Sequence, residues 1–193
     1  MGSTDRAARM GRRLEGTALS LGVDPSGLRL VGRAYALAME PRREALEDDH
    51  DPDYLHPGRC AVILMDDLDQ TDSKVIAAGS LVETERPELA VDPTRIASDL
   101  AVDVADLVSR TPRPGSADLA EALVVEDLSV RLIALVERLD QLRHAHLWAD
   151  MERKGRAHRE AEGVYLPVAR RTHPTLARRY AWWCSMFRRR YLS

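Results

Sequence analysis

Apolar residues recur every three or four positions along most of the chain, a spacing that predicts amphipathic helices because an α-helix turns once in about 3.6 residues. The pattern is clearest in a long helix that we expect to begin beyond Ser116. One stripe of leucines follows it at positions i, i+4, i+7, i+11 and i+14, namely Leu128, Leu132, Leu135, Leu139 and Leu142. This stripe predicts that one face of the helix is buried in a core.

Prolines, turn formers and capping residues divide the rest of the chain into further helices. Pro57 directly follows His56, so His56 is expected at the start of a helix, and Thr71 or Asp72 is expected to cap the next one. One helix is expected from Pro93 to Val108, and a polar stretch, residues 150–163, precedes two last helical pieces. The other predicted segments are residues 1–21, 28–46, 57–68, 75–82, 164–169 and 174–192.

Composition agrees with a helical fold. The chain has 193 residues, of which 45% are hydrophobic and only 5% aromatic, with a single Phe. Apolar content carried by Ala, Leu and Val favours helices over a β-sandwich or barrel. We therefore predict an all-α protein, and Trp182, Trp183 and Phe187, at helical spacing, are expected in its core rather than in a base-stacking platform.

Cysteine use and hydropathy predict the compartment. Cys60 and Cys184 lie far apart with no CxxC pair, and residues 1–21 lack the apolar core of a signal peptide. No apolar run approaches the roughly 18 residues needed to span a bilayer. A cytoplasmic location without membrane association is the expectation.

Charge is unevenly distributed along the chain. Residues 40–106 contain 18 acidic and 6 basic residues, whereas residues 143–193 contain 4 acidic and 12 basic residues. The acidic region would repel a nucleic-acid backbone, which argues against nucleic-acid binding. Oppositely charged faces would instead suit a homo-oligomer.

Three ionisable residues stand at helix starts or on apolar helix faces: His56, Glu83 and Glu137. One imidazole and two carboxylates from three helices would make a site for a divalent ion such as Mn, Fe or Zn. The alternative is structural: His56 caps a helix, and Glu83 pairs with Arg59 or Arg86. Glu137 then pairs with Arg131, Arg138 or an exposed arginine of the C-terminal segment, and no metal is bound. The P-loop, dinucleotide-binding and nucleophile-elbow motifs are absent from the sequence.

Several segments resemble the HD-type hydrolase domain of the RelA/SpoT alarmone enzymes, in its small stand-alone form. In that family one helix opens with His-Pro, a second ends in His-Asp, and a late helix carries Ala-Asp-Arg-Leu-x-Asn-x-Arg. The similar segments here are Tyr54-Leu55-His56-Pro57, Val75-Ile76-Ala77-Ala78-Gly79-Ser80-Leu81, Ala134-Leu135-Val136-Glu137-Arg138-Leu139-Asp140-Gln141-Leu142-Arg143 and Tyr165-Leu166-Pro167-Val168-Ala169. The resemblance implies a leading helix and turn, residues 1–26, followed by an HD-domain-like helical bundle, residues 27–193.

The chain departs from the family at the metal ligands. Val82-Glu83 stands in place of the His-Asp pair and Glu137 in place of the late-helix Asp, so only His56 is a retained ligand. The resemblance also places Gln141 at the family's Asn and Arg143 at its Arg, which implies substrate binding by both. No residue is assigned a catalytic role, because the two catalytic acids of the family fall on Arg86 and Pro87.

Two functions follow from the resemblance. Loss of the His-Asp pair favours a degenerate HD-domain protein without catalysis, acting as a nucleotide- or partner-binding module. The alternative is a metal-dependent phosphohydrolase acting on (p)ppGpp or a related phosphorylated nucleotide, with water completing the metal shell of His56, Glu83 and Glu137.

Overall fold

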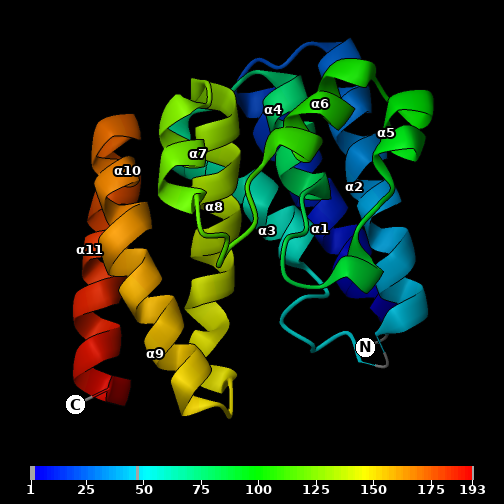
Figure 1. Ribbon diagram of the computed structural model, residues 1–193. Coiled ribbons are helices and arrows are strands. Elements are labelled where there is room, and N and C mark those ends of the chain that lie inside the picture. The colour runs from blue at the N-terminus through cyan, green and yellow to red at the C-terminus, as the bar shows by residue number, and fades with distance from the viewer. Residues whose placement is uncertain (1–2, 47, 193) are drawn as a thin grey trace. The chain divides into compact units, whose positions relative to one another are not determined.

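The computed structural model describes residues 3–46 and 48–192, and every regular element within them is helical (Figure 1). This confirms the predicted all-α fold class. Among the described helices, none has both the length and the apolar character needed to cross a bilayer. The chain divides into two compact units, Met1–Thr111 and Pro112–Ser193. The acidic region of the sequence lies in the first unit and the basic region in the second.

The first unit is built from helices that surround one apolar core. Its elements are α1 (Ser3–Ser20), α2 (Pro25–Ala45), α3 (His56–Val62), the π-helical turn η1 (Ile63–Asp67), α4 (Ser73–Leu81), the 3-10 turn η2 (Pro87–Leu89), α5 (Pro93–Asp99) and α6 (Val102–Arg110). α2 packs along both α1 and α4. Gly27 permits the close approach to α4, because a Cβ there would lie 2.9 Å from Ser73 Cβ.

The leading segment is an integral helix of the first unit. Ala7, Leu14 and Ala18 of α1 are buried in the same core cluster as Val31 and Tyr35 of α2. The Tyr35 hydroxyl donates a hydrogen bond of 3.1 Å to the Ala7 carbonyl. α1 is therefore fixed by packing and by a buried polar contact.

Proline and capping residues correctly predicted where two helices, α3 and α4, begin. α3 begins at His56 with Pro57 in its first turn, as predicted, and the Asp72 side chain accepts from the Lys74 amide to cap α4. The single helix expected from Pro93 to Val108 is wrong, because Ala101 is extended and separates α5 from α6.

The second unit contains a bundle in which α8 lies beside the later helices (Figure 1). Two buried side chains of α11 hold it to α8: the Tyr180 hydroxyl donates to the Leu135 carbonyl at 2.7 Å, and Trp183 Nε1 donates to the Leu142 carbonyl at 2.9 Å. The elements are α7 (Leu119–Val125), α8 (Leu128–His144), the 3-10 turn η3 (Ala145–Leu147), α9 (Met151–Glu160), the π-helical turn η4 (Ala161–Tyr165), α10 (Leu166–Thr172), α11 (Pro174–Phe187) and the π-helical turn η5 (Arg188–Leu192).

Two features of the second unit differ from the sequence prediction. The segment beyond Ser116 forms two helices instead of one long helix, because Glu126 is extended and ends α7. Asp127 then caps α8 by accepting from the Val130 amide at 3.0 Å. Leu128 is consequently exposed, whereas the other four leucines of the stripe are buried. The polar stretch 150–163 is largely α9, whose buried face consists of Lys154, Ala157 and His158.

Candidate functional site

A buried ion pair in the first unit joins the last turn of α2 to the segment after α4. Arg42 of α2 is 2% exposed and its Nη2 donates to Glu83 Oε2 at 2.7 Å. The other guanidinium nitrogens donate to backbone carbonyls at 3.0 to 3.1 Å, namely those of Ala38, Asp53 and Leu89. Burial lowers the pKa of Arg42 from its ordinary value, and the Glu83 carboxylate opposes that effect.

The second oxygen of Glu83 is also engaged. Glu83 lies just beyond the end of α4, and its Oε1 accepts from the amides of Glu85 and Arg86 at 3.1 and 3.0 Å. A carboxylate that binds a guanidinium through one oxygen and two amides through the other does not suit a metal ion, which would also lie beside a buried positive charge. The partner of Glu83 is therefore Arg42, a residue that neither interpretation of the sequence considered.

His56 lies close to this ion pair in the hydrogen-bonding network. Its amide donates to the Asp53 carbonyl at 3.3 Å, the same carbonyl that accepts from Arg42 Nε. The imidazole is fully buried, with its ring nitrogens 3.6 and 3.7 Å from Cys60 Sγ one turn later in α3. Glu137 is buried on α8 in the second unit. The proposed convergence of His56, Glu83 and Glu137 on one ion stays a prediction.

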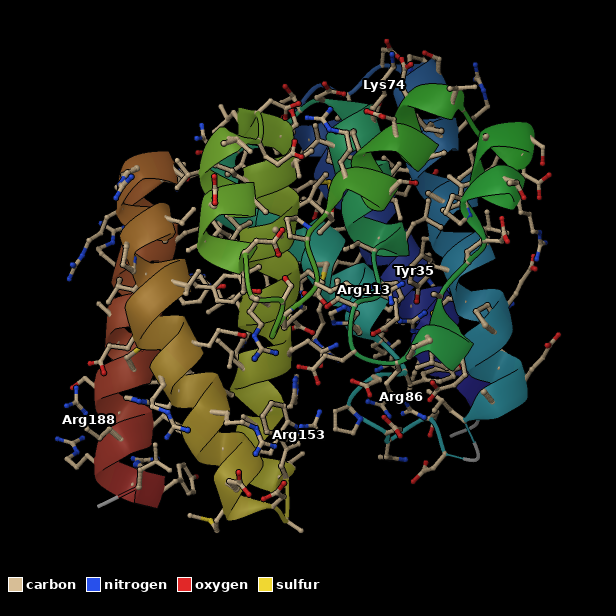
Figure 2. The ribbon with its side chains drawn as sticks, in the orientation of Figure 1. Tyr35, Lys74, Arg86, Arg113, Arg153 and Arg188 are labelled. Carbon is tan, nitrogen blue, oxygen red and sulfur yellow. The ribbon has the colours of Figure 1, made fainter. Side chains whose placement is uncertain are left out.

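Arg86 lies nearer the surface than the Arg42–Glu83 pair and contacts the same loop at Asp53. Figure 2 shows it at the loop that follows α2, where its guanidinium lies 3.2 Å from Asp53, 3.4 Å from Asp51 and 2.8 Å from Glu88. The resemblance gave this position to a catalytic acid. A cation held by three carboxylates instead stabilises the loop and offers no proton-accepting group.

A different kind of site occurs in the second unit, between α8 and α11. A pocket of about 230 Å³ is lined there by Leu139, Arg143, Arg179, Trp182 and Trp183. Trp182 is 66% exposed, whereas its neighbour Trp183 is 2% exposed. The pocket thus combines two guanidinium groups with an accessible indole ring.

Buried contacts join the two helices that line this pocket. The hydrogen bond from Trp183 to the Leu142 carbonyl orients one of the two lining indoles, and Trp183 stacks on Phe187 with ring centroids 4.5 Å apart. Burial raises the pKa of the Cys184 thiol, next in the chain, to about 11. The backbone positions of Arg179 and Trp182 relative to α8 are therefore set by a packed core.

Arg143 is a cation available to a ligand. It lies in the last turn of α8, is exposed, and forms no side-chain hydrogen bond or ion pair with the residues that the structure describes. Gln141, the other predicted substrate-binding residue, does not line this pocket and is buried, with an Nε2 that lacks a hydrogen-bond partner within the described ranges. Two residues apart on a helix, these side chains point in different directions.

Sequence reasoning missed the remaining members of the pocket. Arg179 was not distinguished from the other arginines of the C-terminal segment. The expectation that Trp182 lies in the core is wrong, whereas Trp183 and Phe187 are core residues as predicted. The exposure of one tryptophan could have been predicted from the Trp182-Trp183 pair. Adjacent residues of a helix point about 100° apart, so only one of the two side chains can face α8 fully.

The arrangement suits an anion that carries an aromatic ring. Guanidinium groups bind phosphate through paired hydrogen bonds, and an exposed indole offers a face on which a base can stack. No carboxylate, imidazole, hydroxyl or thiol is among the described residues that line the pocket, so the lining supplies no general base or nucleophile. These groups can bind a ligand through stacking and ion pairing.

No protein-family model and no curated protein matches the sequence of this chain. The resemblance to the RelA/SpoT hydrolase domain, with the homo-oligomer and metal expectations, therefore stays a prediction.

Proposed function

We propose that this protein is a non-catalytic module that binds a phosphorylated nucleotide through its second unit. The observation that carries the proposal is the joint presence of Arg143, Arg179 and the exposed Trp182 around one pocket of about 230 Å³. The pocket is smaller than a typical enclosed ligand site, so the ligand would remain partly exposed. Stacking on Trp182 and ion pairing with the two arginines would supply most of the affinity.

The geometry of the first unit favours binding without hydrolysis. Both oxygens of Glu83 are engaged by Arg42 and by backbone amides, and Arg86 occupies a position where base chemistry would need an acid. The resemblance adds the ligand class, because a guanosine polyphosphate would present both a purine ring and several phosphates. Arg143 is the one predicted substrate residue that lines the pocket.

Isothermal titration with GDP, (p)ppGpp and guanosine tests this function. We expect both phosphorylated ligands to bind and guanosine to bind much more weakly. Arg143→Ala and Arg179→Ala should each weaken binding about tenfold or more, since a hydrogen bond to a charged group contributes about 1.5 to 3 kcal/mol.

Arg178→Ala is the matched control, because Arg178 adjoins Arg179 on α11 and carries the same charge but does not line the pocket. It should change affinity less than about threefold. Equal losses of nucleotide affinity in Arg178→Ala and Arg179→Ala would mean that the ligand is attracted by the overall positive charge of α11 and not bound in the pocket. Turnover of (p)ppGpp with Mn²⁺ that disappears in His56→Ala and Glu137→Gln would instead support the metal-dependent phosphohydrolase.

A further inference from the structure

We propose that the loop after α2 binds a divalent transition-metal ion through Asp48, Asp49 and His50. These three consecutive residues offer one imidazole nitrogen and two carboxylate oxygens, all within 4.8 Å of one another. Nitrogen and oxygen donors of this kind suit first-row ions from Mn²⁺ to Zn²⁺. The site is separate from the nucleotide pocket and from His56, Glu83 and Glu137.

The distances match those between neighbouring ligands of one ion. His50 Nδ1 is hydrogen-bonded to Asp48 Oδ1 at 2.9 Å and paired with Asp49 Oδ1 at 2.9 Å, and a bound ion would replace the proton that these contacts share. Two ligands that each bind an ion at about 2.1 Å and at right angles lie about 3.0 Å apart. The His50 amide donates to Asp48 Oδ1 at 2.8 Å, which fixes the turn that brings the donors together.

One buried carboxylate oxygen of the cluster has no hydrogen-bond partner among the residues that the structure describes. The Asp49 side chain is 8% exposed, yet its Oδ2 has no hydrogen-bond partner among the described residues. An ionised oxygen withdrawn from water without a donor is costly, and a coordinated cation would compensate that cost. Ordinary surface acids do not need such compensation, because water solvates them.

Arg6 of α1 is the competing cation. Its Nη1 donates to the Asp49 backbone carbonyl and lies 3.8 Å from Asp49 Oδ1, beyond hydrogen-bond distance. Arg6 therefore orients the loop backbone, and among the described residues Asp49 Oδ2 still has no hydrogen-bond partner. On the other side, Asp48, His50 and Asp51 line an open pocket of about 500 Å³, through which a hydrated ion can enter and keep its remaining water ligands. Arg86 also lines this pocket, but its charge is already paired with Asp51, Asp53 and Glu88.

Titration of the full chain with ZnCl₂ and MnCl₂, followed by calorimetry and by thermal unfolding, tests this site. We expect one ion per chain and a higher Tm in its presence. Asp49→Asn and His50→Gln should each weaken binding at least about tenfold and abolish the rise in Tm. His50 is exposed, so its variant keeps the fold even if Asp49→Asn does not.

Asp69→Asn and Arg6→Gln complete the experiment. Asp69 is an exposed aspartate with positive φ, which asparagine tolerates, so the first variant removes one charge elsewhere in the unit and should leave binding unchanged. Arg6→Gln should leave metal affinity equal or tighter, because it removes a competing charge. Absence of saturable binding, or equal losses in Asp69→Asn and Asp49→Asn, would overturn the proposal.

Discussion

Arg42 and Arg143 show two uses of the same side chain. Arg42 is buried in the first unit, where Glu83 and three backbone carbonyls use its donors. Arg143 is exposed in the second unit and lines a pocket beside an accessible tryptophan. A guanidinium saturated by its own chain stabilises structure, whereas one without a partner is free to bind a ligand. Substitution of Arg42 should therefore lower the stability of the fold, whereas substitution of Arg143 should lower the affinity for the nucleotide.

The largest effect is expected at the buried ion pair. Glu83→Ala leaves the Arg42 charge buried without its partner and should lower the free energy of unfolding by about 3 to 5 kcal/mol. The joint change Arg42→Met with Glu83→Leu should recover much of this loss, because it removes both charges together. Urea unfolding followed by circular dichroism measures both variants.

Glu88→Ala is the control for that comparison. Glu88 bonds Arg86 at the surface, so its loss should cost at most about 1 kcal/mol. If Glu83→Ala were as stable as wild type and instead lost a bound metal ion, the structural role assigned to Glu83 would be wrong.

The adjacent tryptophans provide an internal comparison within the second unit. Trp183→Phe removes the hydrogen bond to Leu142 and part of a buried ring, and should lower stability by about 1 to 3 kcal/mol. Trp182→Phe should leave stability within about 0.5 kcal/mol of wild type, because the ring is exposed. Nucleotide affinity should depend on the exposed ring instead, so Trp182→Ala should weaken nucleotide binding. Equal effects of the two phenylalanine variants on stability would contradict this division of roles.

Alkaline pH should reveal the buried thiol of the second unit. The Cys184 pKa rises from 9.0 to about 11 on folding, chiefly through burial, so the folded state holds its proton more tightly. Its stabilisation is complete below pH 9 and is lost as the pH rises toward 11, by up to about 2 kcal/mol. Cys184→Ala should make unfolding free energy less dependent on pH over this interval; an unchanged slope would exclude a contribution from this thiol.

The smallest expected effect is that of salt. Raising NaCl from 0.1 to 1 M shortens the Debye length from about 10 to about 3 Å, so nucleotide binding at exposed Arg143 should weaken several-fold. The contribution of the Arg42–Glu83 pair to the free energy of unfolding should change little with salt, because buried ion pairs are screened less than exposed ones. Double-mutant cycles for Arg42 and Glu83 at both salt concentrations measure that contribution directly. A coupling energy that collapses in high salt would mean that the pair is hydrated.

Local chemistry explains which parts of the fold the sequence predicted. The starts of α3 and α4 follow from Pro57 and Asp72, which act on amides within a few residues. The break between α5 and α6 has no comparable signal, because Ile96 and Val104 keep helical spacing across it. α9 was difficult to recognise because part of its buried face comes from Lys154 and His158, residues that hydropathy counts as polar.

The sites required information that no local pattern contains. The burial of Glu83 was predictable from the apolar run before it, but its partner Arg42 lies 41 residues away. Arg179 and Trp182 join Arg143 only because α11 docks on α8 in one particular register. Such registers depend on tertiary packing, which spacing along a single helix does not specify.

The guanidinium of Arg42 also has a consequence for how the first unit opens. It bonds α2 itself, the loop at Asp53, the segment after α4 and the carbonyl of Leu89, which is 47 residues away in sequence. Opening any one of these segments breaks bonds that the same side chain makes to the others. Amide protons in these distant segments should consequently exchange with deuterium as one cooperative group, at a common rate.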